Sequence, residues 1–158
     1  MLTWLPADEQ LVAPAVVPTY FASGAPGVTG TDVVETYPRT TVEWRGGARP
    51  MLWQVMSGFA YRTTGGYFIG SEPGHDVLFE APASDYEMAA VRVGRGGSPP
   101  SDRAGAAARE QLLGLGVTAI VVVPEGADVA AVLNWTRRVS GAPGQQIDDA
   151  WLFRFPPG

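Results

Sequence analysis

One apolar run constrains the fold of this chain more than any other feature. Residues 117–123 read Val-Thr-Ala-Ile-Val-Val-Val, so that only Thr118 interrupts an apolar, largely β-branched sequence. A strand without polar residues at alternate positions is typical of a sheet that is covered on both faces. The run is also far shorter than the ~20 residues that cross a bilayer, and we expect no part of this chain to insert into a membrane.

Helix and strand patterns alternate on both sides of this run. Strands are predicted at residues 31–37, 67–69 and 150–155, helices at residues 50–59, 84–93, 101–113 and 128–139, and a loop at residues 70–82. Pro50 suits the first turn of the helix at residues 50–59. Ser101 or Asp102 can cap the helix at residues 101–113. This order predicts an α/β sandwich with a mainly parallel or mixed sheet of about four to five strands flanked by helices.

The length of 158 residues suits one domain, because a chain of this size can bury roughly 70% of its unfolded surface. Residues 1–30 contain four prolines and three glycines and show no sustained periodicity, which predicts an extended lead-in arm or linker. The α/β domain is expected to comprise residues 31–158. We expect four apolar residues of the arm to lie on the surface of the domain: Val16, Val17, Tyr20 and Phe21.

The charged residues exclude several classes of function. All 11 cations are Arg, the acids number 16, and the formal net charge of −5 disfavours binding to nucleic acid or to anionic lipid. The absence of Cys and the single His exclude disulfides, zinc-thiolate sites and multi-histidine metal sites. The glycine pairs lack the spacing and setting of a phosphate-binding loop. No metal site and no cofactor site are therefore predicted.

Three pairs of residues have the chemistry of an acid/base site: Asp148 with Asp149, Glu35 with Glu43, and His75 with Asp76. Adjacent acids in a turn are usually solvated, and a histidine and an acid that are neighbours in sequence rarely face each other productively. We therefore assign no catalytic residue. A small stand-alone hydrolase or transferase that uses carboxylates remains an alternative.

Aromatic and polar residues gather near the end of the first predicted strand and in the helix that follows it. Ligands of α/β sheets bind beyond the carboxyl ends of the strands, where Tyr37 and the amino end of the Pro50 helix would meet. Flat rings can stack on a sugar, and amide and guanidinium groups can donate hydrogen bonds to it. The candidate ligand-binding residues are Tyr37, Arg39, Trp53, Gln54 and Tyr67. The alternative is that Trp53 and Tyr67 belong to the core.

A set of motifs also carries a family resemblance. They are Tyr37-Pro38, Pro50-Met-Leu-Trp-Gln54, Gly58-Phe59, Gly65-Gly-Tyr-Phe-Ile-Gly70, Leu115-Gly-Val-Thr-Ala-Ile-Val-Val-Val123 and Trp151-x-Phe-Arg154. Over residues 16–155 the chain resembles the soluble C-terminal tail domain of certain polytopic membrane proteins of high-GC Gram-positive bacteria. These proteins are similar to glycosyltransferases that take sugars from lipid-phosphate donors on the outer face of the membrane.

The resemblance implies that catalysis belongs to acidic loops between the transmembrane helices of the parent protein, so that no catalytic residue carries over. It implies an extracytoplasmic domain that is tethered to the plasma membrane, with the membrane part of the parent protein and a glycan as partners; a free-standing relative would be cytoplasmic. Three functions stay open: a non-catalytic accessory domain that binds or positions a cell-envelope glycan, a carboxylate-dependent hydrolase or transferase, and a purely structural interaction module.

Overall fold

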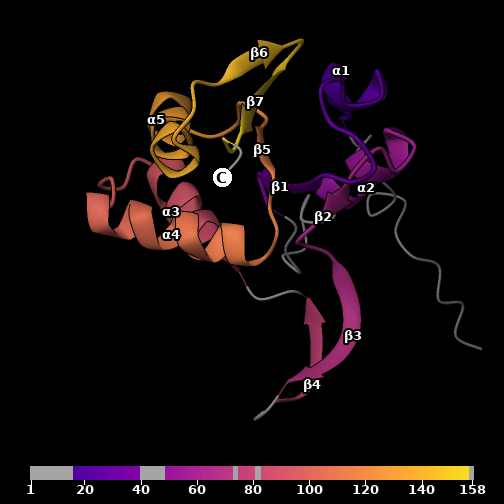
Figure 1. Ribbon diagram of the computed structural model, residues 1–158, viewed down its shortest axis with the longest axis horizontal. Coiled ribbons are helices and arrows are strands. Elements are labelled where there is room, and N and C mark those ends of the chain that lie inside the picture. Colours follow the sequence, from indigo (N-terminus) through magenta and orange to yellow (C-terminus); the bar gives the residue numbers. More distant parts are fainter. Residues whose placement is uncertain (1–15, 40–48, 73–74, 81–82, 157–158) are drawn as a thin grey trace, which may run out of the picture.

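The computed structural model describes residues 16–39, 49–72, 75–80 and 83–156, with the backbone alone for residues 67–72 and 75–80 (Figure 1). Five strands form one sheet: β1 (Val33–Tyr37), β2 (Arg62–Thr63), β5 (Ala119–Val122), β6 (Gln145–Ile147) and β7 (Ala150–Arg154). Their order is β2-β1-β5-β7-β6, in which β1 runs parallel to β2 and β5 while β7 is antiparallel to both of its neighbours. The predicted α/β architecture with a mixed sheet is confirmed.

Helices cover both faces of this sheet (Figure 1). One face carries α3 (Asp85–Gly94), α4 (Asp102–Gly114) and α5 (Val129–Ser140), and we call it the α3–α5 face. The opposite face carries α1 (Thr19–Ala22) and α2 (Arg49–Met56), and we call it the α1–α2 face. Neighbouring residues of β5 alternate between the two cores: Ile120 points to the α3–α5 face and Val121 to the α1–α2 face. The central strand is thus covered on both sides, as its sequence predicts.

The helices of the α3–α5 face begin at local capping residues. Ser84 and Glu87 form a reciprocal capping box at the start of α3, Ser101 accepts a hydrogen bond from Ala104 N, and Asp128 accepts one from the first turn of α5. These bonds satisfy backbone N–H groups that have no partner inside the helix. Among the described residues, no helix has both the length and the apolarity that crossing a bilayer requires.

The described part of the arm, from residue 16 onward, is packed more deeply than its sequence suggests. Tyr20 and Phe21 are completely buried, so the prediction that they lie on the surface is wrong, whereas Val16 is 73% exposed. The ring of Phe21 stacks on that of Trp53, with centroids 4.9 Å apart and planes inclined by 13°. The reason is geometric: α2 is a short helix, and the aromatic side chains of α1 cover apolar sheet surface that α2 leaves open.

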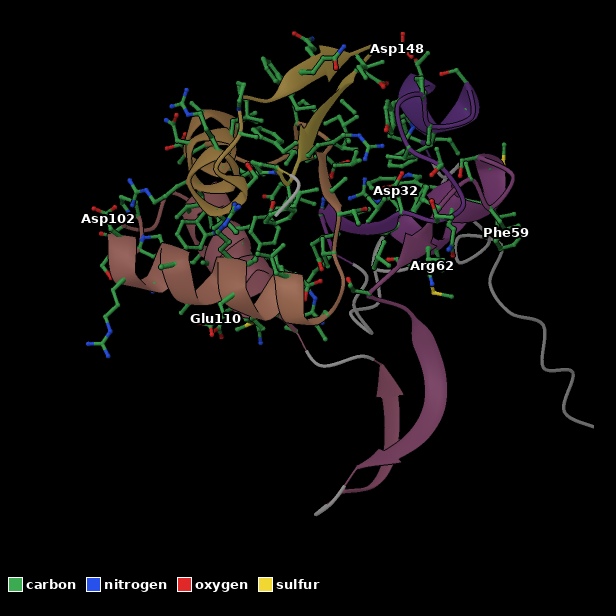
Figure 2. All side chains as sticks on the ribbon, in the orientation of Figure 1. Asp32, Phe59, Arg62, Asp102, Glu110 and Asp148 are labelled. Atoms are coloured by element: carbon green, nitrogen blue, oxygen red, sulfur yellow. The ribbon has the colours of Figure 1, made fainter. Side chains whose placement is uncertain are left out.

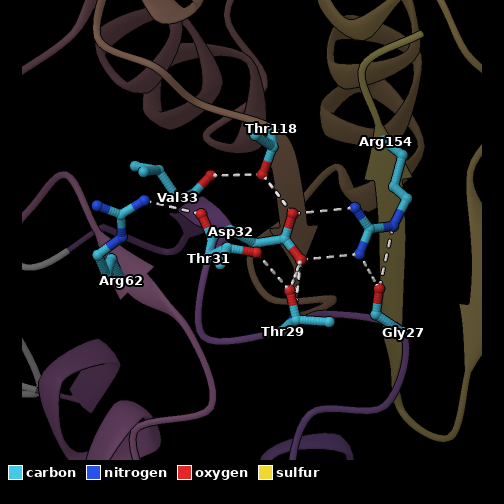
Figure 3. A network of polar contacts seen from close by, with 8 residues as sticks. All are labelled: Gly27, Thr29, Thr31, Asp32, Val33, Arg62, Thr118 and Arg154. Atoms are coloured by element: carbon cyan, nitrogen blue, oxygen red, sulfur yellow. Dashed lines mark hydrogen bonds and ion pairs between the residues drawn. The ribbon is translucent and has the colours of Figure 1, made fainter. Parts of the chain in front are cut away.

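A polar network attaches the same segment to strands β5 and β7 (Figure 3). Arg154 on β7 donates to both carboxylate oxygens of Asp32, at 3.1 and 3.0 Å, and also to the carbonyl oxygen of Gly27. Asp32 accepts further bonds from the Thr118 hydroxyl at 2.7 Å and from Thr29 N at 2.7 Å. Residues 27–32 are therefore joined to β5 and β7 by charge-assisted hydrogen bonds.

A second, two-stranded sheet extends away from the body of the domain (Figure 1). It consists of β3 (Tyr67–Glu72) and β4 (His75–Glu80), which pair antiparallel. The prediction of a loop over residues 70–82 is wrong for the strand residues of this segment. These strand residues are not predicted because the sequence of this segment shows no regular alternation of apolar and polar residues. A hairpin is stabilised by pairing between its strands, which such a pattern does not report.

Candidate functional site

Two carboxyl groups meet between β1 and the first turn of α3. Glu35 is 2% exposed, and its Oε2 accepts a hydrogen bond of 2.6 Å from the Thr64 hydroxyl, just beyond the end of β2. Glu87 is 7% exposed and accepts a hydrogen bond of 2.7 Å from Ser84 N within the capping box. The Arg39 guanidinium lies 3.6 Å from Glu87. The strands β1 and β2 and the helix α3 thus bring an acidic pair and a cation together. Glu35 lies in the middle of β1, and Arg39 lies beyond the carboxyl end of this strand.

The environment of this pair favours a bound proton. Burial raises the pKa of Glu35 well above its ordinary value, and the negative charge of Glu87 and a hydrogen bond between the two carboxyl groups raise it further. The Thr64 hydroxyl and the Arg39 charge act in the opposite direction but are outweighed. A carboxyl group with a raised pKa keeps its proton to a higher pH than an exposed one, and a group of this kind can serve as a general acid.

A second cluster of polar residues lies at the carboxyl ends of β1 and β5. The Tyr37 hydroxyl donates a long hydrogen bond of 3.4 Å to the carbonyl oxygen of Glu125, and Arg49 binds both carboxylate oxygens of Glu125 at 2.8 and 2.6 Å. A Cβ on Gly94 would overlap the Tyr37 hydroxyl, and Gly126 has a φ of +102°, which favours glycine. Two glycines therefore allow the backbone to close over Tyr37.

The five predicted ligand-binding residues do not form one surface. Tyr37 belongs to the core of the α3–α5 face, whereas Trp53 is completely buried in the core of the α1–α2 face, the alternative that the sequence left open for it. The Gln54 side chain donates to the carbonyl oxygen of Tyr61 at 3.0 Å. Arg39 pairs with Glu87, and Tyr67 opens β3, where its side chain lies outside the description. Of these residues, Tyr37 and Arg39 are the two that lie at the carboxyl end of β1.

Asp148 and Asp149 accept hydrogen bonds from the two ends of α1. Asp149 accepts hydrogen bonds from Thr19 N at 2.8 Å and from Tyr20 N at 3.0 Å, so it caps α1 from a distant part of the chain. Asp148 accepts a bond of 3.1 Å from the Ser23 hydroxyl at the other end of α1, and Figure 2 shows it beside that helix. Burial opposes ionisation of Asp149, but several hydrogen bonds, first among them those from Tyr20 N and Thr19 N, outweigh it and lower the pKa of this carboxyl. Both acids therefore stabilise the position of α1.

The other predicted acid/base pairs are only partly described. Glu43 lies outside the described residues, and His75 and Asp76 open β4, where the backbone alone is described. The partner that the structure gives to Glu35 is Glu87, which the sequence analysis did not consider. The spacing Ser84-x-x-Glu87 is a capping box and could have indicated that Glu87 turns back toward the start of α3.

Among the described residues, no three His, Cys, Asp or Glu side chains are grouped closely enough to hold a metal ion. Comparison of the chain with protein-family models, with curated protein sequences and with solved structures found no match. The chemistry available at the site is that of its own residues. They comprise a buried carboxyl pair next to the Thr64 hydroxyl, together with Tyr37 and Arg39 at the carboxyl end of β1. The carboxyl ends of strands are where α/β proteins bind their ligands.

Proposed function

We propose that the chain is a non-catalytic accessory domain that lies outside the membrane in a polytopic protein of the glycosyltransferase type, where it positions a cell-envelope glycan next to the membrane part. The sequence resemblance supports the parent class and the location. One observation carries the non-catalytic part: the charged groups of the site bind one another. Arg39 is paired with Glu87, Arg49 with Glu125, and Glu35 is buried beneath Thr64. Groups that react with substrate must be able to touch it.

The glycan part of the proposal rests on the place of Tyr37 and Arg39 at the carboxyl end of β1, where α/β proteins bind their ligands. A guanidinium has five N–H donors, and the ion pair with Glu87 is made through Nε. Guanidinium donors of this kind can bind the hydroxyl groups of a sugar.

The experiment is an NMR titration of the whole chain with cell-envelope oligosaccharides. We expect shifts at the backbone amides of Tyr37 and Arg39, and we expect the Arg39→Gln variant to weaken them. Arg62→Gln is the matched control, because Arg62 is an exposed arginine that donates to the Thr31 carbonyl oxygen. The absence of shifts in the unmodified protein would overturn the glycan part of the proposal.

A carboxylate-dependent hydrolase or transferase is a second candidate, and the raised pKa of Glu35 beside Glu87 is the observation that favours it. The test is hydrolysis of a panel of aryl glycosides and aryl esters by the unmodified protein, by Glu35→Gln and by Glu110→Gln, the last being an exposed control on α4. Turnover that is lost in Glu35→Gln alone would overturn the non-catalytic proposal. Absence of turnover in all three proteins supports it.

A further inference from the structure

A groove runs between α3 and α4 on the outer side of the helical layer, away from the sheet. Its volume is about 640 Å³, and its walls include Asp85, Met88 and Arg92 from α3 and Arg103 and Ala107 from α4. We call it the α3–α4 groove. Figure 2 shows the start of α4, marked by Asp102, at the outer edge of the molecule. The groove is thus a surface separate from the carboxyl edge of the sheet.

The two ends of the groove are lined by residues of opposite charge. Asp85, Met88 and Arg92 lie at positions i, i+3 and i+7, which places them along one stripe of α3. Asp85 N donates a hydrogen bond of 2.7 Å to the Gln111 side chain near the end of α4, so the two helices run antiparallel. Arg92 therefore lies at the same end of the groove as Arg103 in the first turn of α4, and Asp85 lies at the opposite end.

The middle of the groove is apolar. Met88 is 60% exposed although it is a large apolar side chain, and Ala89, Ala104 and Ala107 leave room between the two helices. Trp135 of α5 lies at the base, where it is 3% exposed and donates a hydrogen bond to the Tyr86 carbonyl oxygen. An occupant with an apolar side would remove Met88 from water, which is favourable.

The end of the groove at Arg92 and Arg103 is positively charged. Arg92 and Arg103 are exposed, and neither forms an ion pair with another described residue. A second groove of about 440 Å³ shares Trp135 with the first and brings Arg137 and Arg138 to the same region. Arg138 is paired with Asp102 at 3.3 Å. Positive charge is thus concentrated at one end of an apolar groove in a chain whose net charge is −5.

We propose that the α3–α4 groove binds an amphipathic helix of a partner protein, with acidic side chains at the Arg92 and Arg103 end and apolar side chains over Met88. The stripe from Asp85 to Arg92 is about 10 Å long, which matches two turns of a bound helix. Helix-in-groove recognition uses apolar anchors at positions i, i+3, i+4 and i+7. A small anion would use the cationic end and leave Met88 in water, so the combination of charge and apolar surface favours a peptide.

The test uses two synthetic capped peptides of about 12 residues, each about 18 Å long as a helix. Both carry leucines at positions i, i+3, i+4 and i+7; one has two glutamates at one end and the other has two lysines there. We expect the glutamate peptide to bind about five-fold more tightly, because two exposed ion pairs form. Backbone amide shifts at Ala89, Ala104 and Ala107 locate the bound peptide.

The decisive variant is the double charge reversal Arg92→Glu with Arg103→Glu, for which we expect the preference to change to the lysine peptide. Arg62→Glu, on another surface, is the matched control and keeps the preference for glutamate. Met88→Ala is a second variant, which weakens both peptides while leaving the preference between them unchanged. Circular dichroism checks that each variant is folded.

Three results would overturn the proposal. They are the absence of shifts with either peptide, equal affinity for both peptides, and a preference that the double charge reversal does not change. A further arm of the experiment uses inorganic phosphate alone. Phosphate shifts at Arg92 and Arg103 without peptide shifts at Ala89 or Ala104 would identify a simple anion site and would also overturn the proposal.

Discussion

The two faces of the sheet are covered in different ways. The α3–α5 face carries helices of 10, 13 and 12 residues, and each begins at a capping side chain of its own sequence. The α1–α2 face carries helices of four and eight residues, and α1 is capped by Asp149 from the opposite end of the chain. One face is therefore built from helices with local start signals, whereas the other depends on contacts between distant segments.

The buried polar groups of the two faces differ as well. Under α3 and α5, the Tyr86 hydroxyl bonds to the Thr136 hydroxyl at 2.8 Å, and the Trp135 indole donates to a carbonyl oxygen. On the α1–α2 face, three buried polar atoms have no hydrogen-bond partner among the described residues: Tyr20 OH, Trp53 Nε1 and Tyr61 OH. An unpaired buried group costs about 1–3 kcal/mol. The α1–α2 face therefore depends more strongly on close aromatic packing and on the Asp32 network.

The largest effect is expected from Phe21→Ala on the α1–α2 face. Phe21 is completely buried against Trp53, and removal of a buried phenyl ring costs about 3–5 kcal/mol of unfolding free energy. Urea unfolding followed by circular dichroism measures the change. Val16→Ala is the matched control, because Val16 is 73% exposed, and we expect less than about 0.5 kcal/mol there. Equal small effects at both positions would mean that the arm is not part of the packed domain.

A smaller loss is expected from Asp32→Asn, which weakens the attachment of the arm to β7. The hydrogen bonds from Arg154, Thr118 and Thr29 hold the pKa of Asp32 well below its usual range despite its burial. Because the Arg154 side chain is 44% exposed, solvent screening limits the expected loss at pH 7 to about 1–2 kcal/mol. Asp102→Asn, at an acid whose side chain is 94% exposed, is the control and should have little effect.

The same variant has a defined dependence on pH. A carboxyl whose pKa is lower in the folded state stabilises the protein fully above its unfolded pKa of about 3.9, and this contribution is lost as the pH falls. We therefore expect the difference between the unmodified protein and Asp32→Asn to be constant near neutral pH and to shrink below about pH 4. A difference that grows on acidification would contradict the assigned role of Asp32.

The sequence predicts all three helices of the α3–α5 face, but of the two helices on the other face it predicts α2 and not α1. Capping residues such as Ser101 and the β-branched run of β5 are local signals, and the structure has elements at these places. The short strands β2 and β6 are stabilised by pairing with distant strands, and α1 by Asp149, so no local pattern marks them. The core position of Trp53 follows from packing against Phe21, which the sequence placed on the surface.

In the candidate site, too, some residues can be placed from local sequence signals and others cannot. Tyr37 and Arg39 could be placed at the end of a strand from local signals, because β1 ends at a proline. The pairing of Glu35 with Glu87 joins a strand to a helix across the intervening hairpin, and the hydrogen bond from Thr64 comes from a third segment. Contacts of this kind depend on the tertiary fold, and the sequence alone suggested Glu43 as the partner of Glu35 instead.

On the α3–α5 face, Ser84→Ala is expected to cost about 1 kcal/mol, because it removes one half of the capping box of α3. Chemical denaturation measures the loss. Ser101→Ala is the comparison: its hydrogen bond to Ala104 N is exposed and 3.3 Å long, so we expect a smaller cost. A larger loss at Ser101 than at Ser84 would contradict the importance given to the buried cap.

The smallest change in unfolding free energy is expected from Glu35→Gln at mildly acidic pH. This substitution is expected to stabilise the protein, whereas the substitutions above destabilise it. A carboxyl whose pKa is raised by folding stabilises the protein below its unfolded pKa, and this contribution is lost as the pH rises toward the folded pKa. The amide of Gln imitates the protonated carboxyl, so we expect the variant to gain relative stability as the pH rises above about 5. Denaturation of both proteins across this range measures the gain, and a relative loss would contradict the raised pKa.

Residues 16–32 and the sheet form one packed unit. Native-state hydrogen exchange tests it most directly through the amides of Tyr20, which donates to Asp149, and Ala25, which donates to the Tyr20 carbonyl oxygen. We expect their opening free energies to lie within about 2 kcal/mol of that of Val121 in β5. Exchange of both amides at the rate of an unstructured peptide, while Val121 stays protected, would contradict the claim.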